Sequence, residues 1–492
     1  MQYRKPFDKA RPEEVGIPSR LILEYIDNLE HSQTEMHGLM IMRHNKMVAE
    51  GWWAPYGPNL RHGLQSHTKT YAATAVGIAY TEGILKLDER LIDIFPDESP
   101  EEPSENLKLL TVRDVLCMGC GMDTMPWNSE HWIKDFMHTP VNHKPGTTYM
   151  YNSTGSTLLG AIVRKKTGLG LHDYLTPRLF NKIGINPDNL RWMCMADGME
   201  VGGGGLYATT EDNFRLMKLY ADGGVWEGER ILAEDYVKLA TTNQNDSASE
   251  SINNPEAFDN FLGYGFQIWM CKPKHTYRAD GAMGQFTIVF PDLDMEIAIN
   301  ETAVGAHWAQ STLDITWKFI EQIKAEGPIE ADDEGYDRLC RKLRTLNIGN
   351  PACQPFSPTI EEISGKKFKV ESGDFTPFGG NFMIGAGPDG IDTFSLDFDD
   401  YGFLWNFTTR NGRQEKIRFT NYLGKPEDLT QIYLGDAYWK EDNVLVMHGR
   451  WVETCIEDTY NLVFEGDGFR VESDNTSAFR FFKPKPIYGK KV

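Results

Sequence analysis

The sequence predicts an α+β domain followed by an all-β domain, and three observations support this prediction. Strand-like runs lie near both ends of residues 1–327, with helical segments between them. Helices and strands segregated in this way favour a mixed or antiparallel sheet over a doubly wound one. Residues 356–492 are short alternating strands separated by turn signals such as "TRNG" and "EGDG", which is typical of a small antiparallel β-barrel or sandwich. Between them, the acidic and proline-rich residues 328–355 predict a linker with a short helix.

Local patterns predict the elements of the first domain in order. The stretch "IPSRLILEYIDNLE" predicts an N-terminal helix, because spaced Leu and Ile follow a Pro-Ser start. Next, "GLMIMRHNKMVAEGWW" predicts a β-hairpin around the polar "RHNK" turn. Helical segments broken by Gly and Pro loops dominate residues 85–234, and strands return at "YGFQIWM", "QFTIVFP" and "MEIAINE". A last helix ends near Gly327, so one sheet is expected to form from the two ends of this domain.

Composition limits the classes of partner. The chain has 492 residues and a formal net charge of −21, which is unfavourable for binding nucleic acid or an anionic membrane. No window has the ~20 apolar residues that span a bilayer, and the start lacks the apolar run of a signal peptide. Seven scattered cysteines do not resemble a disulfide framework. We therefore expect a cytoplasmic protein that binds a small-molecule or short-peptide substrate, and we leave a homo-oligomer open.

The stretch "LQSHTKTYAATAVGIAYTEG", residues 64–83, places a serine and a lysine at the start of a helix that is apolar nearly all round. Residues three apart lie on the same helix face. Free N–H groups and the macrodipole at a helix N-terminus can stabilise an alkoxide and then an oxyanion. A lysine in apolar surroundings has a lowered pKa and can act as a base. Ser66 and Lys69 are therefore a candidate nucleophile and base.

The alternative interpretation is that Ser66 only caps the helix, as serines often do. S-x-x-K is also short enough to arise by chance, and a second match lies at residues 364–367. That copy stands in a polar stretch of the β-rich region with no buried helix behind it. The sequence context therefore favours the pair at Ser66 and Lys69.

Beyond the S-x-x-K motif, the chain resembles the CubicO-type serine hydrolases of the serine β-lactamase and penicillin-binding-protein-like superfamily. The resemblance runs through "RPEEVGIPS", "PGTTYMYNSTGSTLLGAIVRKKTG", "GGGGLYATTEDNFRLMKLYADGG" and "GAMGQFTIVFPDLDMEIAI", in the family's order over roughly residues 10–325. It implies a β-lactamase/transpeptidase-like domain, with an antiparallel sheet flanked by helices and a helical insertion. The second domain would then be a lipocalin-like barrel.

The family's second motif has a tyrosine followed two residues later by an asparagine. The aligned residues here are Tyr151, Asn152 and Ser153. The resemblance therefore implies that Tyr151 is the catalytic tyrosine and that Ser153 takes the place of the asparagine. The alternative for Tyr151 is a tyrosine packed in the core of a helical region.

The family's third motif, K-T-G or H-x-G, aligns with Ala279, Asp280 and Gly281. The usual cation is missing, which puts recognition of a substrate carboxylate in doubt. Gly281 permits close backbone approach, and the resemblance implies an oxyanion hole formed by the main-chain N–H groups of Ser66 and Ala282. The residues expected to bind substrate are Ser153, Ala279, Gly281 and Gln285.

Three other motifs are given structural interpretations. "CMGC", residues 117–120, has no second cysteine pair to complete a zinc site, so we expect two packed thiols. "GGGG", residues 202–205, lacks the Lys-Ser/Thr of a phosphate loop and predicts tight backbone packing, with Thr209 or Thr210 starting the next helix. His67, beside the candidate nucleophile, is expected to have a structural role.

The sequence thus predicts a serine hydrolase that uses neither metal nor cofactor and cleaves an amide or ester through an acyl-enzyme on Ser66. Lys69 and Tyr151 would share its deprotonation. Residues alternate between the two faces of a strand, so either Ala279 or Asp280 faces the site. Both cases disfavour a substrate carboxylate near the scissile bond, since Ala279 offers no charge and Asp280 would repel a carboxylate. The alternatives are a D-amino-acid-specific aminopeptidase or amidase, a β-lactamase, and a non-catalytic binding protein on a hydrolase scaffold.

Overall fold

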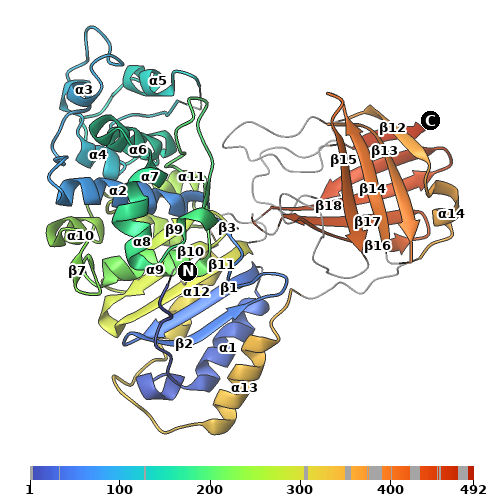
Figure 1. Cartoon of the computed structure of the whole chain (residues 1–492), viewed down its shortest axis with the longest axis horizontal. Coiled ribbons are helices and arrows are strands. Elements are labelled where there is room, and N and C mark those ends of the chain that lie inside the picture. The colour runs from blue at the N-terminus through green and yellow to red at the C-terminus, as the bar shows by residue number, and fades with distance from the viewer. Residues whose placement is uncertain are drawn as a thin grey trace. The chain divides into compact units, whose positions relative to one another are not determined.

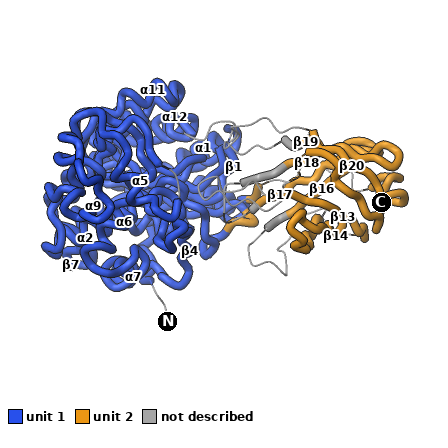
Figure 2. Tube along the Cα trace, turned by 90° about the horizontal axis from the view of Figure 1, so that it is seen from above, with its two compact units in different colours: residues 1–53, 57–346 blue, residues 54–56, 347–492 orange. Residues whose placement is uncertain are grey.

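The structure, a computed structural model, divides the chain into two compact units (Figure 2). The first comprises residues 1–53 and 57–346, and the second comprises residues 54–56 and 347–492. The described residues are 4–32, 34–126, 129–303, 309–348, 356–373, 375, 390–400, 402–420, 433–451, 453, 456–474 and 486–492.

A six-stranded antiparallel sheet forms the centre of the first unit (Figure 1). Its strands in spatial order are β2 (Lys46–Trp52), β1 (Thr34–Arg43), β11 (Met295–Ala303), β10 (Gln285–Phe290), β9 (Tyr277–Gly281) and β8 (Trp269–Met270). The pairing of β1 with β11 joins the two ends of the unit, as predicted. The predicted hairpin turn lies at His44 and Asn45, whose φ angles of 51° and 58° suit a tight turn between twisted strands.

Helices cover both faces of this sheet, so its strands are buried almost throughout. On one face, α1 (Ser19–Glu30) packs on β1 and against α12 (Gln310–Ile320). On the other face, α9 (Thr210–Ala221) packs on β1, β10 and β11 (Figure 1). Thr209 caps α9 in a reciprocal arrangement with Asp212. The predicted start of this helix is therefore confirmed.

The helical insertion surrounds α2 (Thr68–Thr81), which is buried from Thr68 to Ala79 as its uniformly apolar sequence predicts. Among the described residues, no helix is both long and apolar enough to cross a bilayer. The remaining α-helices of the insertion are α3 (Leu91–Ile94), α4 (Val112–Leu116), α5 (Trp132–His138), α6 (Ser153–Thr167), α7 (Leu171–Leu175), α8 (Asn181–Ile183), α10 (Glu234–Ala240) and α11 (Glu250–Asn253).

Short elements connect these helices. The small strands are β3 (His62–Gly63), β4 (Arg191–Trp192), β5 (Leu206–Ala208), β6 (Val225–Trp226) and β7 (Glu229–Arg230). The 3-10 helices are η1 (Pro12–Val15), η2 (Gln65–His67), η3 (Leu107–Leu109), η5 (Pro187–Asn189), η6 (Phe258–Phe261) and η7 (Pro291–Leu293), with one π-helical turn, η4 (Thr176–Phe180).

The helix expected inside the linker, α13 (Asp333–Arg344), packs on α1 and β2. Lys342 forms ion pairs with Asp27 and Glu30 of α1. Gly51 of β2 packs closely against the end of α13. A Cβ at this position would lie 2.6 Å from Leu346 and 3.0 Å from Leu343. The structure thus assigns this helix to the first unit.

The second unit is a closed barrel, which confirms the predicted all-β domain. Its strands are β12 (Lys367–Ser372), β13 (Ile391–Asp399), β14 (Gly402–Thr409), β15 (Gln414–Thr420), β16 (Tyr433–Glu441), β17 (Val444–Trp451), β18 (Ile456–Glu465), β19 (Gly468–Asp474) and β20 (Ile487–Lys491). Helix α14 (Thr359–Ile363) precedes them. An aromatic core that includes Phe368, Phe394 and Trp405 fills the interior. Contrary to the predicted antiparallel arrangement, β15 and β16 pair in parallel; residues 421–432 between them lie outside the described residues.

Candidate functional site

Ser66 lies in the 3-10 turn η2, directly before α2. The preceding Gln65 has a φ of 49°, a backbone conformation that non-glycine residues rarely adopt. Ser66 is half-buried, and the hydroxyl of Thr68 accepts hydrogen bonds from the main-chain N–H groups of Gly205 and Leu206. This turn presents the serine at the start of the helix rather than within its first turn.

Lys69 reaches back from the first turn of α2 to the serine. Its Nζ lies 2.9 Å from Ser66 Oγ, and it also donates a hydrogen bond to the carbonyl of Gly203. The residue is 1% exposed. Burial lowers the pKa of Lys69 to about 7, against a smaller opposing effect of the Asp280 carboxylate. A lysine with such a pKa is partly neutral near pH 7 and can accept a proton.

Tyr151 lies in the loop just before α6, and its backbone is fixed by its neighbour. Asn152 caps α6 by accepting a hydrogen bond from Gly155 N at 2.7 Å. The Tyr151 ring stacks on Trp269 with centroids 5.7 Å apart, and Lys69 Nζ lies 4.7 Å from its centroid. Burial raises the pKa of Tyr151, although a hydrogen bond with Ser66 opposes this. Ser66, Lys69 and Tyr151 therefore meet at one place, with the tyrosine protonated.

The turn after β9 lies beside the serine. A Cβ on Gly281 would come within 2.1 Å of the Leu64 carbonyl and 3.1 Å of His67 N, so only glycine allows this approach. Among the described residues, the main-chain N–H groups of Ser66 and Ala282 have no acceptor. An oxyanion hole requires two such donors on adjoining segments.

Gln285 is fully buried, and its side chain holds this turn from behind. Its amide group hydrogen-bonds the carbonyls of Ala282 and Met283 at 3.4 and 3.3 Å, and that of Glu301 at 2.7 Å. Asn300 donates to its Oε1 at 2.9 Å. These bonds occupy the side chain inside the protein, so we do not keep Gln285 as a substrate-binding residue.

The two other side chains expected to bind substrate, those of Ser153 and Ala279, differ in exposure. Ser153 is the first residue of α6 and is half-buried. Ala279 is fully buried and lies opposite Thr287 of β10. The accessible residue of this strand is Asp280, whose side chain is 13% exposed. Gly281, two residues after Ala279, adjoins the serine turn, so strand alternation places Asp280 on the other face of β9, where Arg278 binds it.

Asp280 is bound by Arg278 Nε at 2.7 Å and acts electrostatically on Lys69 and Tyr151. A second carboxylate, that of Glu250 in α11, also acts on Tyr151 and raises its pKa. Sequence reasoning missed Glu250 and Trp269 as site residues because each lies about a hundred residues or more from Tyr151. Trp269 belongs to the expected strand "YGFQIWM", but nothing in that pattern connects it to Tyr151.

The structure also places the motifs that were given structural interpretations. His67 is buried and bonded to Thr287 Oγ1 at 3.0 Å. Cys117 and Cys120 are free and buried. A Cβ on Gly203 would lie 2.2 Å from the Ser153 carbonyl, so the glycine run packs tightly on α6. In the described part of the chain, no cluster of His, Cys, Asp or Glu side chains could hold a metal.

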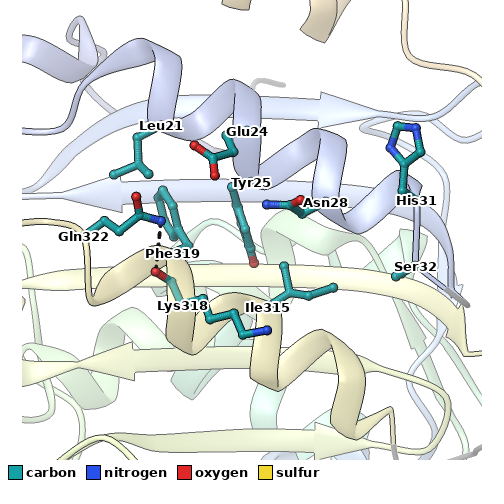
Figure 3. A pocket seen from close by; sticks show the side chains of 10 residues that line it. All are labelled: Leu21, Glu24, Tyr25, Asn28, His31, Ser32, Ile315, Lys318, Phe319 and Gln322. Atoms are coloured by element: carbon teal, nitrogen blue, oxygen red, sulfur yellow. Dashed lines mark hydrogen bonds between the residues drawn. The ribbon is translucent and has the colours of Figure 1, made fainter.

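A separate cavity of about 320 Å³ lies between α1 and α12. Figure 3 shows its side chains, with Tyr25 and Phe319 stacked at 4.3 Å between ring centroids. Neither Ser66, Lys69 nor Tyr151 lines it. It is therefore distinct from the serine site.

Comparisons with known proteins identify the family to which this fold belongs. A family model described as Beta-lactamase matches residues 26–310. The 6-aminohexanoate-dimer hydrolase of Paenarthrobacter ureafaciens is 24% identical over 252 residues, which cover 47% of this chain and 64% of that protein. A protein of Escherichia coli (strain K12) named "Putative D-alanyl-D-alanine carboxypeptidase" is 23% identical over 246 residues, covering 38% of this chain and 57% of that protein. The chain thus spans about three fifths of the length of these curated relatives.

A solved structure titled "Putative 6-aminohexanoate-dimer hydrolase from Bacillus anthracis" has a TM-score of 0.51 at 16% identity. The alignment covers 65% of this chain and 87% of that one. At this identity the similarity concerns the fold alone. Together with the family match, it confirms the predicted α+β domain.

Proposed function

The chain belongs to the beta-lactamase family, and from this premise we propose that it is a serine hydrolase that cleaves an amide or ester bond through an acyl-enzyme on Ser66. The observation that supports this most is the 2.9 Å distance between Lys69 Nζ and Ser66 Oγ in a buried setting. A nucleophile beside a base of lowered pKa is the arrangement that activates a hydroxyl. The finer assignment to the CubicO-type hydrolases is part of this proposal.

Acylation begins when neutral Lys69 accepts the proton of the Ser66 hydroxyl. Ser66 Oγ then attacks the scissile carbonyl carbon, and the main-chain N–H groups of Ser66 and Ala282 hold the resulting oxyanion. Removing one such donor typically costs about 10²–10³ in rate. Tyr151, which its raised pKa keeps protonated, gives its proton to the leaving nitrogen or oxygen. The ammonium of Lys69 restores that proton to the phenolate.

Deacylation uses the same groups in reverse. Lys69 accepts a proton from a water molecule, and the hydroxide attacks the acyl carbon. The tetrahedral intermediate collapses, and Ser66 Oγ leaves with the proton that Lys69 returns. General acid–base help of this kind typically contributes ~10²–10⁴ in rate. No step needs a metal or an organic cofactor.

The proposed substrates lack a carboxylate beside the scissile bond. The Asp280 carboxylate lies within electrostatic range of Lys69 and Tyr151 and would repel a carboxylate placed beside them. Simple esters, amides and amine-bearing acyl compounds fit this constraint. An aminopeptidase or amidase for D-amino-acid compounds fits it too, whereas a β-lactamase fits it less well.

Labelling with a fluorophosphonate probe tests the proposal. The parent protein should be labelled on Ser66, and Ser66→Ala should lose the label. Ser364→Ala is the matched control, because it removes the serine of the second S-x-x-K match and should leave labelling intact. Absence of any label, together with no turnover of p-nitrophenyl acetate, would favour the alternative of a non-catalytic binding protein.

A comparison of nitrocefin with p-nitrophenyl acetate tests the substrate class. We expect kcat/KM for the ester to exceed that for nitrocefin, because the carboxylate of nitrocefin approaches Asp280. Nitrocefin turnover equal to or above that of the ester would contradict this part of the proposal.

A further inference from the structure

Three aromatic side chains form a cluster against which Tyr151 packs. Trp269 stacks on Tyr151, and Tyr264 meets Trp269 edge-on with centroids 4.7 Å apart. Tyr149 meets Tyr264 edge-on at 5.7 Å. We call Tyr149, Tyr151, Tyr264 and Trp269 the aromatic wall. Aromatic faces of this kind attract ammonium groups as well as apolar ones.

Two carboxylates lie near the aromatic wall. Ser249, next to Glu250, donates a hydrogen bond to the Tyr149 carbonyl at 3.4 Å, and Arg278, which binds Asp280, lies over the Trp269 ring. Glu250 and Asp280 act electrostatically on the hydroxyls of Tyr149, Tyr151 and Tyr264. Glu250 accepts a hydrogen bond from Asn254 at one oxygen, and Asp280 accepts one from Arg278 at one oxygen. No hydrogen bond to another described residue is seen at the second oxygen of either carboxylate.

The balance of nearby charges is negative. Arg278 is fully buried and acts on two acids, Asp280 and Asp259. Glu250 is 6% exposed, and its side-chain partner is the neutral amide of Asn254. The other cation near Asp280 is Lys69, whose pKa of about 7 makes it at best a partial positive charge at neutral pH. Burial raises the pKa of the Glu250 and Asp280 carboxyl groups, so a bound cation would stabilise their ionised forms.

The Tyr149 hydroxyl gives an independent indication of a ligand. Tyr149 is 5% exposed, and its hydroxyl oxygen is buried without a hydrogen-bond partner among the described residues. The same hydroxyl lies within electrostatic range of Glu250 and Asp280. Buried hydroxyls are normally hydrogen-bonded, so this oxygen and the two carboxylates together offer the acceptors that an ammonium group needs.

We propose that the aromatic wall, Glu250 and Asp280 form a subsite for a primary ammonium group carried by the acyl portion of the substrate. The inference rests on the proposed hydrolase function and narrows its substrate class to aminoacyl amides and esters. Three acceptors of this kind match the three N–H donors of an ammonium group. Charge-assisted hydrogen bonds to it would be stronger than neutral ones.

Steady-state kinetics on p-nitroanilides would test the subsite. The substrates are those of glycine, β-alanine and γ-aminobutyric acid, each with a free amine, with an N-acetyl group and with an N-succinyl group. These acyl groups are achiral and vary the distance from amine to carbonyl. For at least one length, kcat/KM should fall in the order amine, acetyl, succinyl. The ratio of amine to acetyl should be about tenfold or more.

Two variants assign this preference to the subsite. Glu250→Gln keeps the shape of the side chain and should lower the amine-to-acetyl ratio by about tenfold. Tyr149→Phe removes only the hydroxyl and should lower the ratio in the same direction. Asp280 is left in place because its loss would strand the buried Arg278. Glu256→Gln, at an exposed acid six positions after Glu250, is the matched control and should keep the parent ratio.

The outcomes separate the subsite from the hydrolase itself. If p-nitrophenyl acetate is turned over and no amine is preferred at any length, the ammonium subsite is wrong and the hydrolase stands. The subsite is equally wrong if the preference survives in both variants. If Ser66 takes no fluorophosphonate label and no substrate is turned over, both proposals are wrong.

Discussion

The Nζ of Lys69 lies 2.9 Å from the Oγ of Ser66, and burial lowers the pKa of this lysine to about 7. Burial makes the lysine a usable base, and it also lowers the stability of the folded protein whenever the lysine is protonated. These two consequences, and the positions of Tyr151 and Gly281 around the pair, lead to four predictions.

The first prediction concerns the pH dependence of activity. Because only neutral Lys69 can accept the serine proton, kcat/KM for p-nitrophenyl acetate should rise with pH through an inflection near 7. Lys69→Arg keeps a positive charge at every accessible pH and should lose at least about 10² in rate. Lys108→Arg, at an exposed lysine paired with Glu105, is the control. An inflection near the ordinary lysine pKa of 10.5 would contradict the lowered pKa of Lys69.

The second prediction concerns stability, and its sign follows from proton binding. Between about 7 and 10.5, the folded and ordinary pKa values of Lys69, the unfolded chain holds a proton that the folded chain lacks. Stability therefore rises with pH across this window, and the full cost of the lysine is present below it.

Lys69→Met removes that cost while filling similar space. At pH 6 the variant should be more stable than the parent by a few kcal/mol, less the penalty for the Gly203 carbonyl that loses its donor. The difference should shrink as the pH approaches 10. Urea unfolding at pH 6, 8 and 10 measures it. A Met variant that is less stable than the parent at pH 6 would contradict the burial argument.

The third prediction separates the role of Tyr151 from that of Lys69. Tyr151→Phe keeps the ring stacked on Trp269 and removes only the proton that we assign to the leaving group. A p-nitrophenolate leaves without that proton, whereas an amine does not. The variant should therefore lose about 10²–10⁴ on alkyl amides and much less on p-nitrophenyl esters. Equal losses on both substrate types would argue that Tyr151 acts on Ser66 instead. Tyr80→Phe, at a tyrosine bonded to Asp235, controls for the loss of a hydroxyl.

The fourth prediction tests the close approach of β9 to the serine turn. In Gly281→Ala, the new Cβ would meet the Leu64 carbonyl at 2.1 Å and push Ala282 away from Ser66. The rate of fluorophosphonate labelling should fall by about 10²–10³, as for loss of an oxyanion donor, and overpacking should lower the stability by about 1–3 kcal/mol. Gly57→Ala meets nothing within 4 Å and should match the parent. Labelling of Gly281→Ala at the parent rate would exclude this turn from the site.

Local sequence determined much of the fold. The β-hairpin at β1 and β2 follows from alternating apolar residues around two that adopt positive φ. The buried α2 follows from its unbroken run of small apolar residues. Ser66 and Lys69 could be paired from sequence because three residues along a helix bring side chains onto one face. The barrel could be predicted because turn signals such as "TRNG" and "EGDG" separate its alternating strands.

Tertiary structure alone decided the rest of the site. Tyr151 could be assigned only through a resemblance, since nothing local connects it to a serine 85 residues earlier. The alternation of a strand allowed two orientations of Ala279 and Asp280, and only the packing of β9 on β10 and on the serine turn decided between them. Glu250 and Trp269 join Tyr151 because separate segments pack around one aromatic cluster. Sequence determines spacing along the chain, whereas contacts between distant segments depend on how whole faces bury one another.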